Sequence, residues 1–221
     1  MKVATAATHD TQRHRGTEAV DLETRERLIE ASARLFAERG FSKVTVREIC
    51  QRAHANVAAV NYHFGGKDGL YQEIVGSAIR TMQKTTEEIR DEGARRPAEE
   101  QLAIFVRIFL SRVMEHKDGW IHQLMMQEIR DPTPGLDRVV KSVVRPRLEY
   151  LGSVIARILH CPADDERVQY GVMSVQVQCL AMLNDRIAQF QPLPPWTPKR
   201  IEALAEHIAK FSLAGIKALR R

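Results

Sequence analysis

The sequence predicts an all-α protein of about nine helices, with a small N-terminal helical domain followed by a larger one. Three observations support this prediction. Apolar residues recur every three or four positions along most of the chain, and helix-capping residues stand where these stretches begin. No stretch alternates apolar and polar residues with the period of two that marks a β-strand. Because 44% of the 221 residues are hydrophobic, the chain has enough apolar side chains for a sizeable core.

Charge, cysteines and apolar runs narrow the class of protein further. The formal net charge is +5, which favours a polyanionic partner without identifying one. Cys50, Cys161 and Cys179 form no paired motif and lie in or beside apolar helical stretches, so we expect reduced thiols that pack in a core. No stretch approaches the ~20 consecutive apolar residues of a membrane span, and no signal-peptide pattern is present. We therefore expect a cytoplasmic protein that contacts no membrane.

The beginning of the chain predicts an arm and then a first helix. Residues 1–20 are small, polar and charged without an apolar period, and we interpret them as a flexible arm. Basic residues at 13–15 have the chemistry to enter a DNA minor groove; the alternative is a tail that contacts only solvent. Helical periodicity begins at Leu22 and ends at Gly40, which suits a helix C-cap.

Two short helices are predicted next. Thr45 and Glu48 form the capping-box pattern that begins a helix, and Asn56 is a suitable cap for another that ends near Tyr62. Only two residues, at 54–55, separate the first of these helices from the cap of the second. Two short helices that meet at a tight turn are a helix-turn-helix, whose second helix can lie in the DNA major groove.

The second short helix has side chains suited to reading DNA. The alanine pair at 58–59 is small enough to allow close approach to base edges. Asn61 offers both a donor and an acceptor, the pair that reads adenine. Tyr62, His63 and Lys67 stand at the end of the helix, where a hydroxyl, an imidazole and an ammonium group can meet phosphate oxygens.

Longer helices follow. Pro146 lies inside one of them and predicts a kink or a break, because proline removes a backbone hydrogen bond. Thr197 is suited to cap the last helix, with Pro198 in its first turn. We expect these helices at about 67–90, 98–115, 120–130, 136–159, 164–188 and 198–219.

This arrangement resembles the TetR/AcrR family of transcriptional regulators. The resemblance implies a helix-turn-helix DNA-binding domain over residues 21–66 and a ligand-binding and dimerisation domain over residues 67–221. His54 stands where many members carry glycine, and Asn61 where many carry tyrosine; because histidine tolerates a positive φ better than most residues, we expect the turn to form. The matching residues are Thr24, Phe36, Gly40, the run 45–49, Ala53, Asn56, the run 62–64, Lys67 and Leu70.

The resemblance also implies which residues face an operator. Packing is the alternative role for Tyr62, and we expect Phe64 and Leu70 in the core. The residues implied at the operator are Thr45, Arg47, Asn56, Val57, Ala59 and Asn61, with Tyr62, His63 and Lys67 on phosphates.

A homodimer is implied because specific operators usually present two half-sites. The resemblance places the interface in the last two helices, which would form a four-helix bundle with their symmetry mates. The alternative for the same residues is a core within one chain. The interface candidates are Val172, Val175, Cys179, Leu183, Ile201, Leu204, Ile208 and Phe211.

The middle helices would enclose a small-molecule effector. Residues 127–133 are similar to the CecR-like branch of the family, whose regulators are associated with export and drug-tolerance genes. Aromatic and methionine side chains make adaptable cavity walls, with plain core packing as their alternative role. The candidates are Phe105, Phe109, Trp120, Met125, Met126, Glu128 and Gln176.

Together these features predict a nucleoid-associated homodimeric repressor that a small-molecule effector releases from a palindromic operator. The alternative is a DNA-bound adaptor that has no small-molecule inducer. No enzyme motif is present, so we expect no catalytic residues and no cofactor. His116, His122 and Glu128 lack the spacing of a metal-binding helix, and we expect no metal site.

Overall fold

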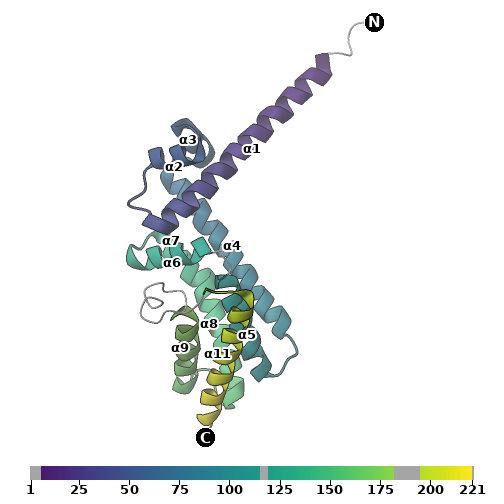
Figure 1. Ribbon diagram of the computed structural model, residues 1–221, viewed down its shortest axis with the longest axis vertical. Helices are drawn as coiled ribbons and strands as arrows, with labels where there is room; N and C mark the ends of the chain where they lie inside the picture. Colours follow the sequence, from purple (N-terminus) through teal and green to yellow (C-terminus); the bar gives the residue numbers. More distant parts are fainter. Residues whose placement is uncertain (1–5, 115–118, 182–194, 221) are drawn as a thin grey trace. The chain divides into compact units, whose positions relative to one another are not determined.

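The structure is a computed structural model that describes residues 6–114, 119–181 and 195–220, with side chains from residue 20 onward. All secondary structure in these ranges is helical, so the predicted all-α class is confirmed. Residues 134–159 are helical without a break, so nine helical rods cover the described ranges. The elements are α1 (Ala6–Arg39), α2 (Val46–Ala53), α3 (Val57–Phe64), α4 (Lys67–Gly93), α5 (Ala98–Met114), α6 (Gly119–Arg130), α7 (Pro134–Val139), a π-helical segment (Val140–Val144), α8 (Arg145–Leu159), α9 (Glu166–Ala181) and α11 (Pro198–Ala218) (Figure 1).

The first helix begins earlier than its apolar period indicated. Helix α1 starts at Ala6 rather than near Leu22, so most of the predicted arm is helical. The stretch 6–20 contains no proline, and seven of its fifteen residues are the good helix formers Ala, Gln, Arg and Glu, so a helix can continue through it without an apolar face. The side chains of the basic residues at 13–15 lie outside the described residues, as does the end of the helix predicted over 164–188.

The helices form two compact units. The first comprises residues 1–77 and 123–135, and the second comprises residues 78–122 and 136–221. The predicted boundary at residue 66 differs from this division, because the first turns of α4 bury Leu70 and Ile74 in the core of the first unit.

The first unit is built around aromatic and aliphatic side chains of α1 to α4. Leu28, Phe36, Ile49 and Val60 are fully buried. The ring of Phe36 meets the ring of Tyr71 edge to face at 5.0 Å between centroids, a favourable geometry for an aromatic pair. This core fixes α2 and α3 against α1.

The core of the second unit is centred on α5, which packs against α8 and α11. Helix α8 also packs against α9 and α11. The largest fully buried side chains here are Phe105, Ile89, Leu102, Leu110, Leu151 and Ile155.

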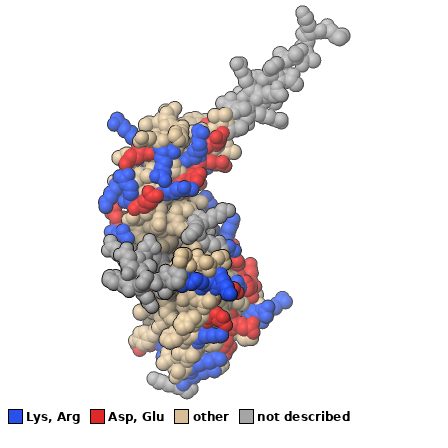
Figure 2. All heavy atoms as spheres, viewed as in Figure 1, with Lys and Arg blue, Asp and Glu red and all other residues tan. Residues whose placement is uncertain are grey.

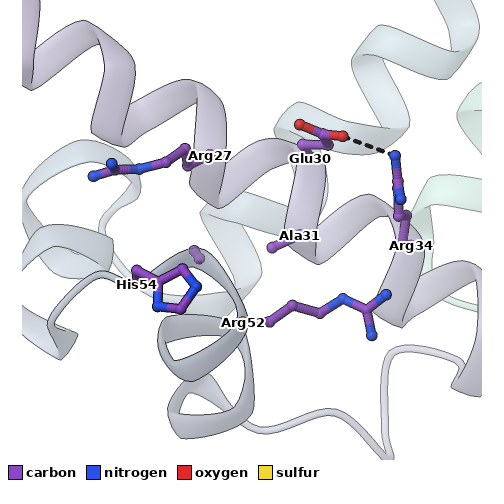
Figure 3. Close-up of a pocket in the computed structure, with 7 residues that line it drawn as sticks. Arg27, Glu30, Ala31, Arg34, Arg52 and His54 are labelled. Carbon is purple, nitrogen blue, oxygen red and sulfur yellow. Dashed lines mark hydrogen bonds and ion pairs between the residues drawn. The ribbon is translucent and has the colours of Figure 1, made fainter.

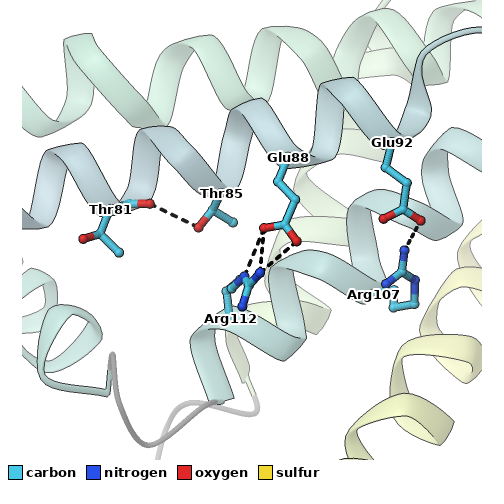
Figure 4. Close-up of polar contacts among 6 residues, drawn as sticks. All are labelled: Thr81, Thr85, Glu88, Glu92, Arg107 and Arg112. Atoms are coloured by element: carbon cyan, nitrogen blue, oxygen red, sulfur yellow. Dashed lines mark hydrogen bonds and ion pairs between the residues drawn. The ribbon is translucent and has the colours of Figure 1, made fainter.

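Ion pairs join α4 to α5 at the surface of the second unit (Figure 4). Arg112 donates from Nη2 to Glu88 Oε1 at 2.8 Å and from Nε to Glu88 Oε2 at 3.0 Å. One turn further along α4, Glu92 pairs with Arg107. Both pairs remain roughly two-fifths exposed, so each is worth at most about 1 kcal/mol.

Pro146 does not break its helix. The preceding turn widens into the π-helical segment, in which the N–H of Arg145 bonds to the carbonyl of Val140. The missing N–H of Pro146 leaves the carbonyl of Ser142 without its usual helical donor. Gln83 Nε2 donates to that carbonyl at 3.4 Å, which satisfies it from α4.

Candidate nucleic-acid interface

A capping box begins α2, as predicted. The hydroxyl of Thr45 accepts from the N–H of Glu48 at 3.3 Å, and the N–H of Thr45 donates to Glu48 Oε2 at 2.8 Å. Arg39, the last residue of α1, donates to Glu48 Oε1 at 2.7 Å. The bonds from Arg39 and then from Thr45 lower the pKa of Glu48 from 4.5 to about 2. The carboxylate therefore ties the start of α2 to the end of α1.

The turn between α2 and α3 forms around a left-handed residue. His54 has φ 49° and ψ 46°, the left-handed conformation that glycine adopts without strain. Asn56 then caps α3 by accepting from the N–H of Ala59 at 2.8 Å. The predicted caps and the predicted turn are confirmed.

The junction of α3 with α4 depends on Gly69, which the sequence analysis did not single out. A Cβ atom at this position would lie 1.8 Å from the carbonyl oxygen of Phe64, the last residue of α3. Such contact is impossible, so only glycine lets α4 approach the end of α3 this closely. Gly65 and Gly66, which join the two helices, both have positive φ angles.

Helix α3 presents a row of exposed side chains. Tyr62 is 77% exposed and Val57 is 46% exposed, and Asn56 and Asn61 are also exposed. Arg47 is exposed on α2. Val60 is the residue of α3 in the core, and Ala59, His63 and Phe64 are partly buried beside it, so the opposite side of the short helix carries the exposed residues.

Other candidates for DNA contact have partners inside the first unit. The side chain of His63 is only 7% exposed, and its Nε2 lies 3.4 Å from Asp21 Oδ1. The ammonium of Lys67 lies 4.1 Å from the centre of the Phe41 ring. Thr45 serves its helix cap, and Ala59 is half-buried.

Charges of both signs cover the region of α1 to α3. On the face that Figure 2 shows, Lys and Arg side chains of this region lie beside Asp and Glu side chains. Several arginines of this region pair with nearby carboxylates, among them Arg27 with Glu23 and Arg34 with Glu30.

The segment 127–133, at the end of α6, belongs to the first unit and is bonded to it. Gln127 Nε2 donates to the carbonyl of Glu38 at 3.0 Å. The hydroxyl of Ser42 donates to the carboxylate of Asp131. These contacts hold the segment against the end of α1 and the loop that follows it.

Glu128 is the buried polar centre of this segment. It is 1% exposed and accepts from the Thr133 N–H at 3.1 Å, from the Thr133 hydroxyl at 2.9 Å and from the Tyr71 hydroxyl. Burial and then the neighbouring Glu128 raise the pKa of Tyr71 well above its usual value, so the phenol keeps its proton. The Glu128 carboxylate, which was predicted to line an effector cavity, therefore accepts its hydrogen bonds from Tyr71 and Thr133. The sequence alone could not predict the hydrogen bond from Tyr71, because Tyr71 and Glu128 lie 57 residues apart.

The remaining effector candidates divide between the two units. Met125 and Met126 are half-buried in the first unit. In the second unit Phe105 and Phe109 are core residues with parallel rings 6.0 Å apart. Trp120 in α6 is partly buried. Gln176 in α9 is also partly buried, and its Oε1 is buried without a hydrogen-bond partner among the described residues.

Some dimer candidates belong to the core of one chain. Val175, Cys179 and Ile208 are at most 3% exposed, which agrees with the alternative of a core within one chain. Burial raises the pKa of the Cys179 thiol to about 12, which fits the packing role expected for the cysteines. Val172, Ile201 and Leu204 are partly buried, Phe211 is exposed, and Leu183 lies outside the described residues.

Known family models cover both units. The model for bacterial regulatory proteins of the tetR family matches residues 28–74. The model for the C-terminal domain of the HTH-type transcriptional dual regulator CecR matches residues 98–216, more than half of the chain. The chain belongs to the TetR family. As a TetR regulator with a CecR-like C-terminal domain, it is a DNA-binding transcriptional regulator and belongs to a non-enzymatic family.

Similar proteins agree with this assignment. The probable HTH-type regulator YttP of Bacillus subtilis (strain 168) is 35% identical over 94 residues, 42% of this chain and 45% of YttP. CecR of Shigella flexneri is 25% identical over 155 residues, 66% of this chain and 69% of CecR. The TetR regulator thus spans less than half the length of YttP in this match.

Solved structures show the same fold. The TetR family regulator PfmR from Thermus thermophilus has a TM-score of 0.64 at 22% identity, with 88% of this chain and 100% of PfmR covered. A TetR-like regulator from Rhodococcus sp. RHA1 also has a TM-score of 0.64, at 19% identity, with coverage of 87% and 96%.

Within the part of this TetR regulator that the structure describes, no helix has the length and apolar character needed to cross a bilayer. No group of three or more His, Cys, Asp or Glu side chains within those residues can hold a metal ion. His116, one of the residues weighed for metal binding, lies outside them.

Proposed function

We propose that this TetR regulator is a homodimeric repressor that leaves a palindromic operator when a small-molecule effector binds. The observation that carries the proposal is the exposed row of α3, where Asn61 and Tyr62 project from a helix fixed at both ends by caps. A rigid short helix with an exposed amide is suited to read base edges in the major groove. Arg47 and Lys67 would add phosphate contacts.

An exposed apolar stripe on α9 and α11 supports the dimer. Tyr170, Met173 and Val177 follow each other at helical spacing on α9 and are 57–60% exposed, and Phe211 on α11 is 65% exposed. Large apolar side chains gathered in this way mark an interaction surface. This stripe replaces the buried residues named from the sequence as the proposed interface.

The C-terminal unit is the proposed effector site. Gln176 there has a buried acceptor without a donor among the described residues, and a ligand that carries a donor would satisfy it. Helices α4 and α6 each contribute residues to both units, so movement of either helix on effector binding would reach the helix-turn-helix. We propose that the hydrogen bonds of segment 127–133 attach the end of α6 to the first unit.

Repression and target genes are proposed by similarity. BepR of Brucella suis biovar 1 (strain 1330), named an HTH-type transcriptional repressor, is 38% identical over 64 residues. The probable acrEF/envCD operon repressor of Escherichia coli (strain K12) is 38% identical over 58 residues. The CecR-like C-terminal domain favours export or drug-tolerance genes as targets.

Selection of bound duplexes from a random pool tests the proposal. The full-length protein should enrich a palindrome whose half-site centres lie about 34–36 Å apart, one turn of DNA. A screen of small molecules for release of that duplex then tests the effector. Absence of sequence preference at low ionic strength contradicts the proposed function. Sequence preference that no small molecule alters, together with a stable protein partner, favours a DNA-bound adaptor.

A further inference from the structure

Arg147 is a buried charge in the second unit that the proposed function does not use. It lies in the first turn of α8, directly after the π-helical segment, and is only 8% exposed. π-Helical turns are rare and occur frequently at functional sites. Burial lowers the pKa of Arg147 from 12.5 to about 10, so the guanidinium group remains charged at neutral pH. The second unit therefore holds a positive charge below its surface.

The partners of Arg147 are neutral groups. Its Nη2 donates to the carbonyl of Met82 at 2.7 Å, and its Nε donates to the hydroxyl of Thr86 at 3.0 Å, both on α4. Its Cζ atom lies 5.4 Å from the centre of the Phe109 ring on α5. Among the residues that the structure describes, no carboxylate pairs with Arg147. A buried charge without a counter-ion is unfavourable, so an anion that reached it would be bound.

Two exposed arginines show the contrast. Arg34 pairs with Glu30 on α1 (Figure 3), and Arg112 pairs with Glu88 between α5 and α4 (Figure 4). The side chains of both pairs are at least 40% exposed. The chain thus supplies counter-ions at the surface, where water already screens the charge, while no described residue supplies one to Arg147.

The two bonds to α4 orient Arg147, but α4 does not depend on them. The hydroxyl of Thr86 itself donates to the carbonyl of Met82 at 3.0 Å, so both groups are satisfied within their own helix. Removal of Arg147 would leave neither of them without a hydrogen bond. The bonds therefore fix the direction of the guanidinium group, as the anchor of a ligand requires.

Part of the guanidinium group is available to a ligand. An arginine side chain has five N–H donors, and the bonds to α4 use two of those of Arg147. Its Nη1 has no hydrogen-bond partner within the described residues. This atom is not sealed from solvent, because Gln176 Oε1 is the only side-chain atom in the same ranges that is both fully buried and without a partner. Both N–H groups of Nη1 can therefore donate to an incoming acceptor.

We infer that Arg147 binds the carboxylate of an organic-acid effector, with its Nη1 as a donor and its contacts on α4 and α5 holding it in place. The planar fork of arginine matches the two oxygens of a carboxylate, and a charge-assisted bond is about twice as strong as a neutral one. A single guanidinium group balances a single negative charge, which favours a carboxylate over a dianionic phosphate. The body of the acid is apolar, because Phe109 and its neighbour Phe105 lie beside the charge. This inference rests on the proposed function, since it names the class of effector that the second unit binds.

Thermal unfolding of the full-length protein without DNA tests the inference. The probes are benzoate, naphthoate and decanoate, each paired with its uncharged primary amide. An acid that binds should raise the melting temperature by about 3–6 °C at about ten times its Kd. The paired amide has the same apolar body without the charge and should give no such rise. Equal rises for an acid and its amide, or no rise with any of the three acids, overturn the inference.

Arg147→Met separates ligand binding from folding. It should abolish the response to the acids while the melting temperature without ligand stays the same or increases, because a buried charge without a counter-ion is removed. Arg147→Lys keeps the charge without the fork and should weaken acid binding about tenfold. Arg112→Met removes an arginine whose partner is already a carboxylate, and should respond as the wild type does. A response that survives unchanged in both variants of Arg147 overturns the inference.

Release of a selected operator duplex distinguishes this inference from the proposed function. If acids bind through Arg147 and no small molecule releases the duplex, the proposed release mechanism is wrong and the carboxylate site stands. If an uncharged compound releases the duplex and no acid binds, the proposed function stands and the inference about Arg147 is overturned.

Discussion

At the scale of single residues, a missing methyl group sets the position of the recognition helix. Gly69 allows α4 to begin directly against the carbonyl of Phe64, and no side chain fits there. His54 has the opposite role: a side chain is kept where the backbone favours its absence. Asn61 and Tyr62 are exposed between these two positions.

Gly69→Ala should therefore displace α3 from α4. The new Cβ meets backbone rather than a flexible side chain, so we expect a loss of about 1–3 kcal/mol in the free energy of unfolding and weaker DNA binding. Urea unfolding and fluorescence anisotropy measure the two effects. Gly119→Ala, at a helical glycine with open space around it, should lose neither. Equal behaviour of the two variants would show that the junction is not tight.

Asn61 and Lys67 should differ in what they contribute to DNA binding. Asn61→Ala should reduce discrimination at one base position by about 1–3 kcal/mol. Lys67→Ala should weaken binding to all sequences and flatten the salt slope by about 0.9. Binding to single-substitution operator variants at several salt concentrations separates the two. If both variants act alike on every sequence, the assignment of base and phosphate contacts is wrong.

At the scale of elements, caps decide where the short helices begin. The starts of α2, α3 and α11 were predicted because cap residues act on neighbours three positions away. The start of α1 was not predicted, because a polar stretch can be helical without an apolar period. Periodicity likewise predicted that Val175 is buried but not what covers it. The contacts of segment 127–133 join residues far apart in sequence, which no local pattern reports.

Thr45→Ala should lower the free energy of unfolding by about 1 kcal/mol, because the cap of α2 is lost.

Glu48, the partner of Thr45 in the capping box, makes the stability of the protein depend on pH. Its folded pKa is about 2, below the ordinary 4.5, so its contribution is complete above about pH 4.5 and disappears as the pH falls toward 2. Unfolding curves of the wild type and Glu48→Gln should therefore differ at pH 6 and converge near pH 2. A difference that persists at pH 2 would contradict the role given to the Glu48 charge.

At the scale of the whole molecule, the exposed apolar stripe of α9 and α11 is a feature that packing within one chain does not explain. Four large apolar or aromatic side chains there are more than half exposed. The family resemblance pointed to these two helices, but only the structure separates the side that packs inward from the side that is open.

Phe211→Glu, combined with Met173→Glu, should convert the proposed dimer to monomers, because two like charges would be buried against their symmetry mates. Analytical ultracentrifugation measures the mass of the particle. The affinity for a palindromic operator should fall when the dimer is lost. Ile129→Glu places the same charge on another exposed apolar residue, 61% exposed, and should leave the dimer intact. A double variant that still sediments as a dimer would place the interface elsewhere.

The wide turn at 140–144 has a consequence for how relatives are compared. An ordinary α-helix advances about 100° per residue, and a π turn holds one residue more than an α turn. A relative shorter by one residue here can close the turn and keep α8 in phase with the helix before it. An alignment with such a relative would place a one-residue gap within 140–144, and a deletion made there should be tolerated where one in the middle of α8 is not.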